Sequence, residues 1–247
     1  MTQLPQTLDE AIAQAKEATQ AALNDGKTRL QVELIFPEIA LQAQSIAQEF
    51  IPLFEQYGSG LKVFFPDTGA AALARRDWGE VPFKISDIGT SRSPIETRVQ
   101  PEDQAFLLVC PSYVEVAQVE KLCNLAGDRP CVLLVPQLED LYVVGIGYVA
   151  RKLRDRFVTT IESCYYLRPM EGAALLYSYP GLWQVWLETD GDYKLIAQEP
   201  QKPLGDTLDQ ILAKATSPND GNTSEAPPPK KPGFLTNLQR FINALSR

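Results

Sequence analysis

Two short segments of the chain carry residue types that could bind a phosphorylated ligand. Residues 67–69 (DTG) follow a predicted strand and open a predicted helix, and residues 145–150 (GIGYVA) match the pattern GxGxxA. Backbone N–H groups at a helix N-terminus or a glycine-rich turn bind anions in α/β folds. Helix capping or close helix packing would explain the same residues without a ligand. The ligand-binding candidates are Asp67, Thr68, Gly69, Gly145 and Gly147.

The chain of 247 residues contains no histidine, which limits the chemistry that these segments can support. The usual general base near neutral pH, the usual metal ligand and the Ser-His or Cys-His nucleophile are therefore absent. The cysteines form no CxxC pair, so we expect buried, reduced thiols rather than a zinc site. They are Cys110, Cys123, Cys131 and Cys164. We predict no catalytic residue, no metal site and no cofactor, although carboxylates, lysines or arginines leave an enzymatic role open.

Strands and helices alternate along the first part of the chain. Continuous apolar runs at 61–65, 105–110 and 131–135 are typical of strands that are buried on both faces of a parallel sheet. Residues 7–10 (TLDE) form a capping box and predict the start of the first helix. Polar and proline-rich residues at 89–103 predict a long exposed loop.

The character of the sequence changes after residue 147. A basic helix is expected at 147–157, followed by a strand at 158–167. Residues 183–198 indicate a hairpin that turns at Asp190-Gly191. The sequence therefore predicts an α/β fold, with a three-layer, Rossmann-like mixed sheet. Its parallel strands come first, and an antiparallel hairpin forms its C-terminal edge.

Three regions follow from the composition. Residues 1–216 should form a single α/β domain, and the polar, proline-rich stretch 217–233 should be a disordered linker. Residues 234–247 predict an amphipathic helix that is too short to be stable alone. It must pack on a partner, a membrane surface or its own domain. The candidate partner-binding residues are Phe234, Leu238, Phe241, Ile242 and Leu245.

The chain is acidic, with 31 acidic and 23 basic residues and a net charge of −8. Such a chain repels phosphate backbones, so nucleic acid is not an expected partner. The N-terminus shows no signal or transit segment, and no apolar run is long enough to span a membrane. We therefore expect a cytoplasmic protein, with any membrane contact peripheral and made through the C-terminal helix.

Several segments taken together resemble a known family. They are LPQTLDEAIAQAKEATQAALNDGKTRLQVEL, KVFFPDTGAAALA, DRPCVLLVPQLED, GIGYVARKLRDRF and YSYPGLWQVWLE. They look like an uncharacterised domain family of cyanobacteria and plastids that includes plant low-photosystem-II-accumulation proteins, and the resemblance covers roughly residues 4–200. The family has no agreed active site. The resemblance implies a role in photosystem II biogenesis. One plant architecture in the family joins this domain to an adenylate kinase, which implies a nucleotide-related role.

Two functions from different classes follow as expectations. The first is a non-catalytic accessory protein for photosynthetic complexes, peripheral at the thylakoid membrane, whose C-terminal helix engages a photosystem assembly component or the membrane. The second is an enzyme that binds a nucleotide or a phosphorylated metabolite at the C-terminal ends of the strands. Family context is an analogy, so neither expectation identifies a site.

Overall fold

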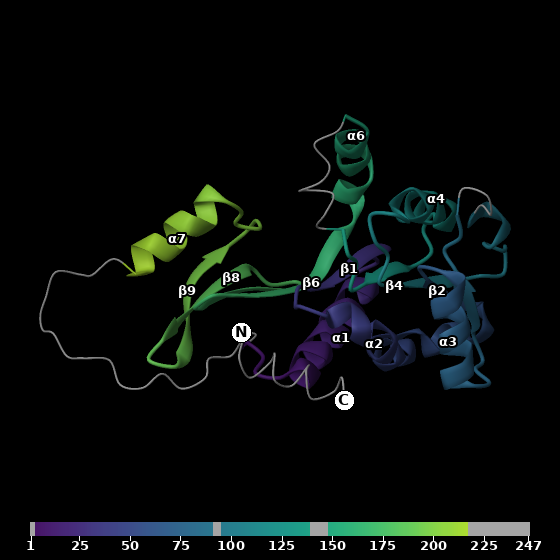
Figure 1. The fold of residues 1–247 in the computed structure, drawn as a ribbon, viewed down its shortest axis with the longest axis horizontal. Coiled ribbons are helices and arrows are strands. Elements are labelled where there is room, and N and C mark those ends of the chain that lie inside the picture. The colour runs from purple at the N-terminus through teal and green to yellow at the C-terminus, as the bar shows by residue number, and fades with distance from the viewer. Residues whose placement is uncertain (1–2, 91–94, 139–147, 217–247) are drawn as a thin grey trace, which may run out of the picture.

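A nine-stranded sheet organises the computed structural model, which describes residues 3–90, 95–138 and 148–216 (Figure 1). The strands lie in the order β3-β2-β4-β5-β1-β6-β7-β8-β9, with β1 to β6 parallel and β7 to β9 antiparallel. Their bounds are β1 Arg29–Leu34, β2 Leu61–Phe65, β3 Lys84–Asp87, β4 Ala105–Val109, β5 Cys131–Leu134, β6 Glu162–Met170, β7 Ala173–Ser178, β8 Trp183–Thr189 and β9 Asp192–Glu199.

Helices cover both faces of this sheet. In Figure 1, α1, α2 and α3 lie below the sheet, and α4, α6 and α7 lie above it. The α-helices are α1 Leu8–Asn24, α2 Ala43–Phe50, α3 Thr68–Trp78, α4 Val116–Ala126, α6 Tyr148–Arg156 and α7 Asp206–Thr216. The 3-10 segments are η1 Ile39–Gln42, η2 Ile51–Gly60, η3 Ile95–Thr97 and η4 Val158–Thr160. The predicted three-layer α/β fold is confirmed, whereas the predicted linker 217–233 and helix 234–247 lie outside the described residues.

Local sequence signals set the start of the first helix. The Thr7 side chain accepts a hydrogen bond from the Glu10 N–H at 3.1 Å. The Glu10 carboxylate accepts from the Gln6 N–H at 2.6 Å, one residue before the N-cap, so the Thr7 bond of the predicted capping box forms and the reciprocal bond goes to Gln6.

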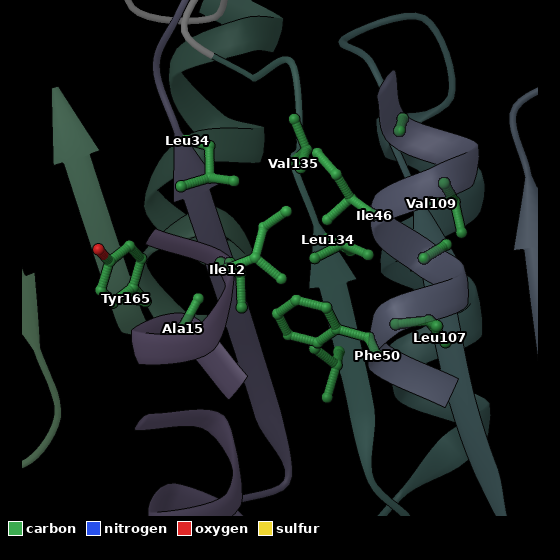
Figure 2. Packing of buried hydrophobic residues seen from close by; sticks show 14 of the residues in the cluster. Ile12, Ala15, Leu34, Ile46, Phe50, Leu107, Val109, Leu134, Val135 and Tyr165 are labelled. Atoms are coloured by element: carbon green, nitrogen blue, oxygen red, sulfur yellow. The ribbon is translucent and has the colours of Figure 1, made fainter. Parts of the chain in front are cut away.

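Burial divides the core between the two faces of the sheet. Every residue of β2, β4 and β5 is buried, as their apolar runs predict. The cluster on the α1–α3 side is called the lower cluster here, and the cluster beneath α4 and α6 is called the upper cluster. Figure 2 shows the lower cluster, with the labelled side chains Ile12, Ala15, Leu34, Ile46, Phe50, Leu107, Val109, Leu134, Val135 and Tyr165.

The prediction of an exposed loop at 89–103 is wrong for the C-terminal end of this segment. Asp103 is fully buried, and its carboxylate accepts hydrogen bonds from Lys84 at 2.7 Å and from the Gln100 N–H at 2.8 Å. Lys62, which is buried within β2, reaches the same carboxylate at 3.4 Å. An apolar strand that carries a lysine needs a buried counter-charge, and this loop supplies it.

We expect Asp103→Asn to lower the free energy of unfolding by about 3 kcal/mol, because it leaves the Lys62 ammonium buried without its carboxylate. Burial alone would raise the pKa of Asp103, but Lys84, the Gln100 N–H and the charge of Lys62 hold that pKa below its ordinary value of 3.8. The Asp103 contribution should therefore be complete at neutral pH. This contribution to stability should decrease as the pH falls below about 4, because the carboxylate of Asp103 is protonated at a higher pH in the unfolded chain than in the folded protein.

Urea unfolding of both proteins between neutral and acidic pH checks this expectation. Glu102→Gln is the matched control, because Glu102 also pairs with Lys84 but is exposed, and it should lower the free energy of unfolding much less than Asp103→Asn does. Equal losses for the two variants would show that the buried ion pair does not stabilise the fold.

Candidate functional site

The carboxyl ends of the parallel strands meet at one edge of the sheet. From β2 the chain passes outward to β3 through α3, which packs in the lower cluster. From β4 it passes the opposite way to β5 through α4, which packs in the upper cluster. The connections therefore diverge between β2 and β4, and open α/β sheets bind ligands outside the strand ends at such a point.

The name carboxyl edge is used for the described loop residues that directly follow β1 to β5. They are residues 35–38, 66–67, 88–90, 110–115 and 135–138.

Asp67 lies on the carboxyl edge and Thr68 and Gly69 adjoin it, but they surround a helix end that is already capped. All three are exposed, and Asp67 Oδ1 accepts a hydrogen bond from the Ala70 N–H at 2.9 Å. A Cβ atom at Gly69 would lie 3.0 Å from the same oxygen, so the capping carboxylate accounts for the glycine. An anion at this helix end would meet a negative charge at close range. Gly145 and Gly147 lie outside the described residues.

A turn held by a serine and a glutamate precedes α4 on the same edge. The Ser112 hydroxyl donates to Glu115 Oε2 at 2.6 Å, and the Ser112 N–H donates to the same oxygen at 2.9 Å. The sequence analysis missed this pair, although the spacing S-x-x-E at 112–115 carried the signal. These bonds hold the turn at 112–115 that leads into α4, and the serine hydroxyl is engaged in that structural role.

Two neighbouring strands leave the sheet through the same unusual turn. Cys110 after β4 has a φ of 50° and Val135 after β5 has a φ of 51°, and each precedes a proline. The two turns are joined because the Gln137 N–H donates to the Pro111 carbonyl at 2.8 Å. Positive φ is rare for a β-branched residue such as Val135, and such strain concentrates at functional sites.

A cavity of about 340 Å³ opens between the ends of β1 and β5. The side chains that line it are apolar except for Gln137, whereas polar atoms of the backbone and of Gln137 make up nearly half of the lining surface. The lining residues are Leu34, Ile35, Phe36, Pro37, Ile39, Pro136 and Gln137. Segments adjacent to the cavity residues in the sequence, or bridged to them, also expose large apolar side chains. Leu41 in η1 is 70% exposed, and Val114, two residues after the Ser112–Gln137 bridge, is 68% exposed. Sequence reasoning did not find this site, because it joins short segments about 100 residues apart and none of them carries a motif.

The carboxyl edge is acidic as well as apolar. Its described residues include Glu38, Asp67 and Glu115 but no lysine or arginine. Asp87, at the end of β3, pairs with Arg98 at 2.9 Å, so its charge is balanced locally. The edge therefore combines a cavity lined mainly by apolar side chains with three acidic side chains in the described loops.

The thiols are poor nucleophiles. Burial and the charge of Glu115 raise the pKa of Cys110 to about 11, and burial raises that of Cys164 to about 12. Cys123 and Cys131 are buried with their sulfurs 3.3 Å apart. Within the described part of the chain, no group of acidic or cysteine side chains could hold a metal ion. No helix of that part is long and apolar enough to cross a membrane.

We expect iodoacetamide to alkylate Cys110 slowly near neutral pH, because only the thiolate reacts and a pKa of about 11 keeps the thiol protonated. The rate should rise about tenfold per pH unit up to roughly pH 10. Mass spectrometry of peptides from the native protein should show the other three cysteines modified only after unfolding. Rapid labelling of Cys110 at neutral pH would instead indicate an activated thiol.

The comparisons with known proteins agree with the resemblance seen in the sequence. No solved structure matches the chain. The model of a family described as a domain of unknown function, DUF1995, matches residues 5–210, which include every strand of the sheet. The chain therefore belongs to the DUF1995 family.

Proposed function

We propose that this protein is a non-catalytic binding module that holds a basic, amphipathic segment of a partner protein at the carboxyl edge. The observation that carries the proposal is a cavity lined mainly by apolar side chains, together with three acidic side chains and no basic one in the loops defined as the carboxyl edge. An apolar stripe with flanking lysines or arginines satisfies both features at once.

The cavity fits apolar side chains better than a nucleotide. Its volume lies at the lower end of the range for small-molecule sites, and Gln137 is the one polar side chain that lines it. The exposed Leu41, Tyr113 and Val114 would add apolar contact area beside it. The surrounding carboxylates attract cationic groups and repel phosphates.

The family resemblance extends the proposal to a biological setting. We propose that the partner is a component of photosystem II assembly. The protein would act as a cytoplasmic accessory factor, with peripheral contact at the thylakoid membrane. The support for this step is the resemblance of residues 4–200 to a family with photosystem-related plant members, and it is independent of the geometry of the carboxyl edge.

A nucleotide- or phosphate-binding enzyme is the second candidate. The observation in its favour is that Asp67, Thr68 and Gly69 lie beside the point where the connections diverge. The capping carboxylate of Asp67 works against it, because it occupies the N–H group that a phosphate would use. We therefore rank this candidate second.

We expect a fluorescein-labelled, lysine- and leucine-rich amphipathic peptide of about the length of residues 234–247 to bind the full chain. Leu41→Ser with Val114→Ser should weaken binding about tenfold, because both apolar side chains are lost from the contact. Glu38→Gln with Asp67→Asn should weaken it several-fold at low salt and little at high salt, because screening removes the charge contribution. Asparagine keeps the helix cap of Asp67. Fluorescence anisotropy measures each affinity.

The matched control is Leu125→Ser with Leu182→Ser, which removes two apolar side chains that are exposed elsewhere on the surface. It should leave the affinity unchanged. If the control weakens binding as much as the edge variant does, or if a glutamate-rich peptide binds equally well, the carboxyl edge is not the site.

We expect nucleotides, dinucleotides and phosphorylated metabolites at millimolar concentration, with or without Mg²⁺, to leave the Tm of the full chain unchanged. A ligand that binds only the folded state raises the Tm by mass action. A clear rise in Tm that the Gly69→Ala variant does not show would favour the second candidate, a nucleotide- or phosphate-binding enzyme.

A further inference from the structure

We propose that the chain's own segment 230–247 occupies the carboxyl edge in the free protein, so that a partner must displace it. This inference rests on the proposed function and names the regulation of the same site.

The segment has the chemistry that the carboxyl edge selects. On a helical projection, one stripe gathers most of its large apolar side chains, namely Phe234, Leu238, Phe241, Ile242 and Leu245. The segment contains Lys230, Lys231, Arg240 and Arg247 but no aspartate or glutamate. A cationic, amphipathic helix of this kind complements an acidic edge with an apolar cavity.

The charge distribution of the whole chain favours the same docking. Residues 217–247 carry four basic and two acidic side chains, whereas the whole chain carries a net charge of −8. The preceding domain therefore attracts the segment, and the loops at its carboxyl edge offer acidic groups without a competing lysine or arginine.

The chain between the domain and the segment is long enough. Helix α7 ends at Thr216, which leaves residues 217–229 as the connection, about 43 Å when fully extended. A domain of this size has a radius of gyration of about 17 Å. Tethering also sets an effective concentration in the millimolar range, so even a weak contact is occupied most of the time.

Carbodiimide cross-linking of the full chain tests the contact. The reagent joins a lysine amine to a carboxylate as an amide with loss of water. Lys230 and Lys231 should link to Glu38, Asp67 or Glu115 more often than to other exposed carboxylates such as Glu49 or Asp192. Phe241→Asp with Ile242→Asp should reduce these links at least fivefold, because the apolar stripe can no longer enter the cavity.

Thr236→Asp with Asn243→Asp is the matched control, because it adds the same charge to the opposite side of the helical projection. It should keep most of the links. An equal mixture of unlabelled and isotope-labelled protein distinguishes cross-links within one molecule from cross-links between two copies. Links within one isotope form support the inference, and links between the two forms would replace it with docking on a second copy.

The model amphipathic peptide separates this inference from the proposed function. The Phe241→Asp, Ile242→Asp protein should bind that peptide at least threefold more tightly than the unaltered chain, because occupancy by the segment raises the apparent Kd. Equal affinities with no preferred cross-links would overturn the docking and leave the binding module intact. If the peptide fails to bind either protein, the proposed function fails as well.

Discussion

Burial of β2, β4 and β5 on both faces is the constraint on which the rest of the structure depends. Strands whose residues are all buried need a helical layer above and below the sheet. Parallel strands joined through such layers must cross over, and the crossovers bring every strand's carboxyl end to the same edge. The site follows from this arrangement, because segments about 100 residues apart then emerge side by side.

The conformation and charge of the carboxyl edge are set by the residues that directly follow each strand. Cys110 and Val135 turn through positive φ, and the following prolines and the Ser112–Gln137 bridge hold the two exits together. The Asp67 carboxylate caps α3, and the Glu115 carboxylate holds the turn that leads into α4 by accepting hydrogen bonds from Ser112, so groups with local structural roles also make the edge acidic. On the proposed function, these structural requirements produce the surface that would select cationic, apolar partners over phosphates.

Signals that act over a few residues could be predicted from the sequence. The capping box at Thr7, the buried strands and the hairpin turn at Asp190-Gly191 all depend on such signals. The buried position of Asp103 could not be predicted. Its neighbours in the sequence are polar, as in a solvent-exposed loop, and its counter-charge Lys62 lies 41 residues away. The cavity was missed for the same reason, since its shape arises from strand order rather than from any motif.

Mapping of amide chemical shifts in isotope-labelled full-length protein, titrated with the basic amphipathic peptide, tests the central claim most directly. The account predicts that the largest changes cluster at residues 35–41, 110–115 and 135–138, and that α1 and the β8–β9 hairpin stay unchanged. Changes that cluster on α1, α7 or the hairpin, or the absence of any change at saturating peptide, would contradict it.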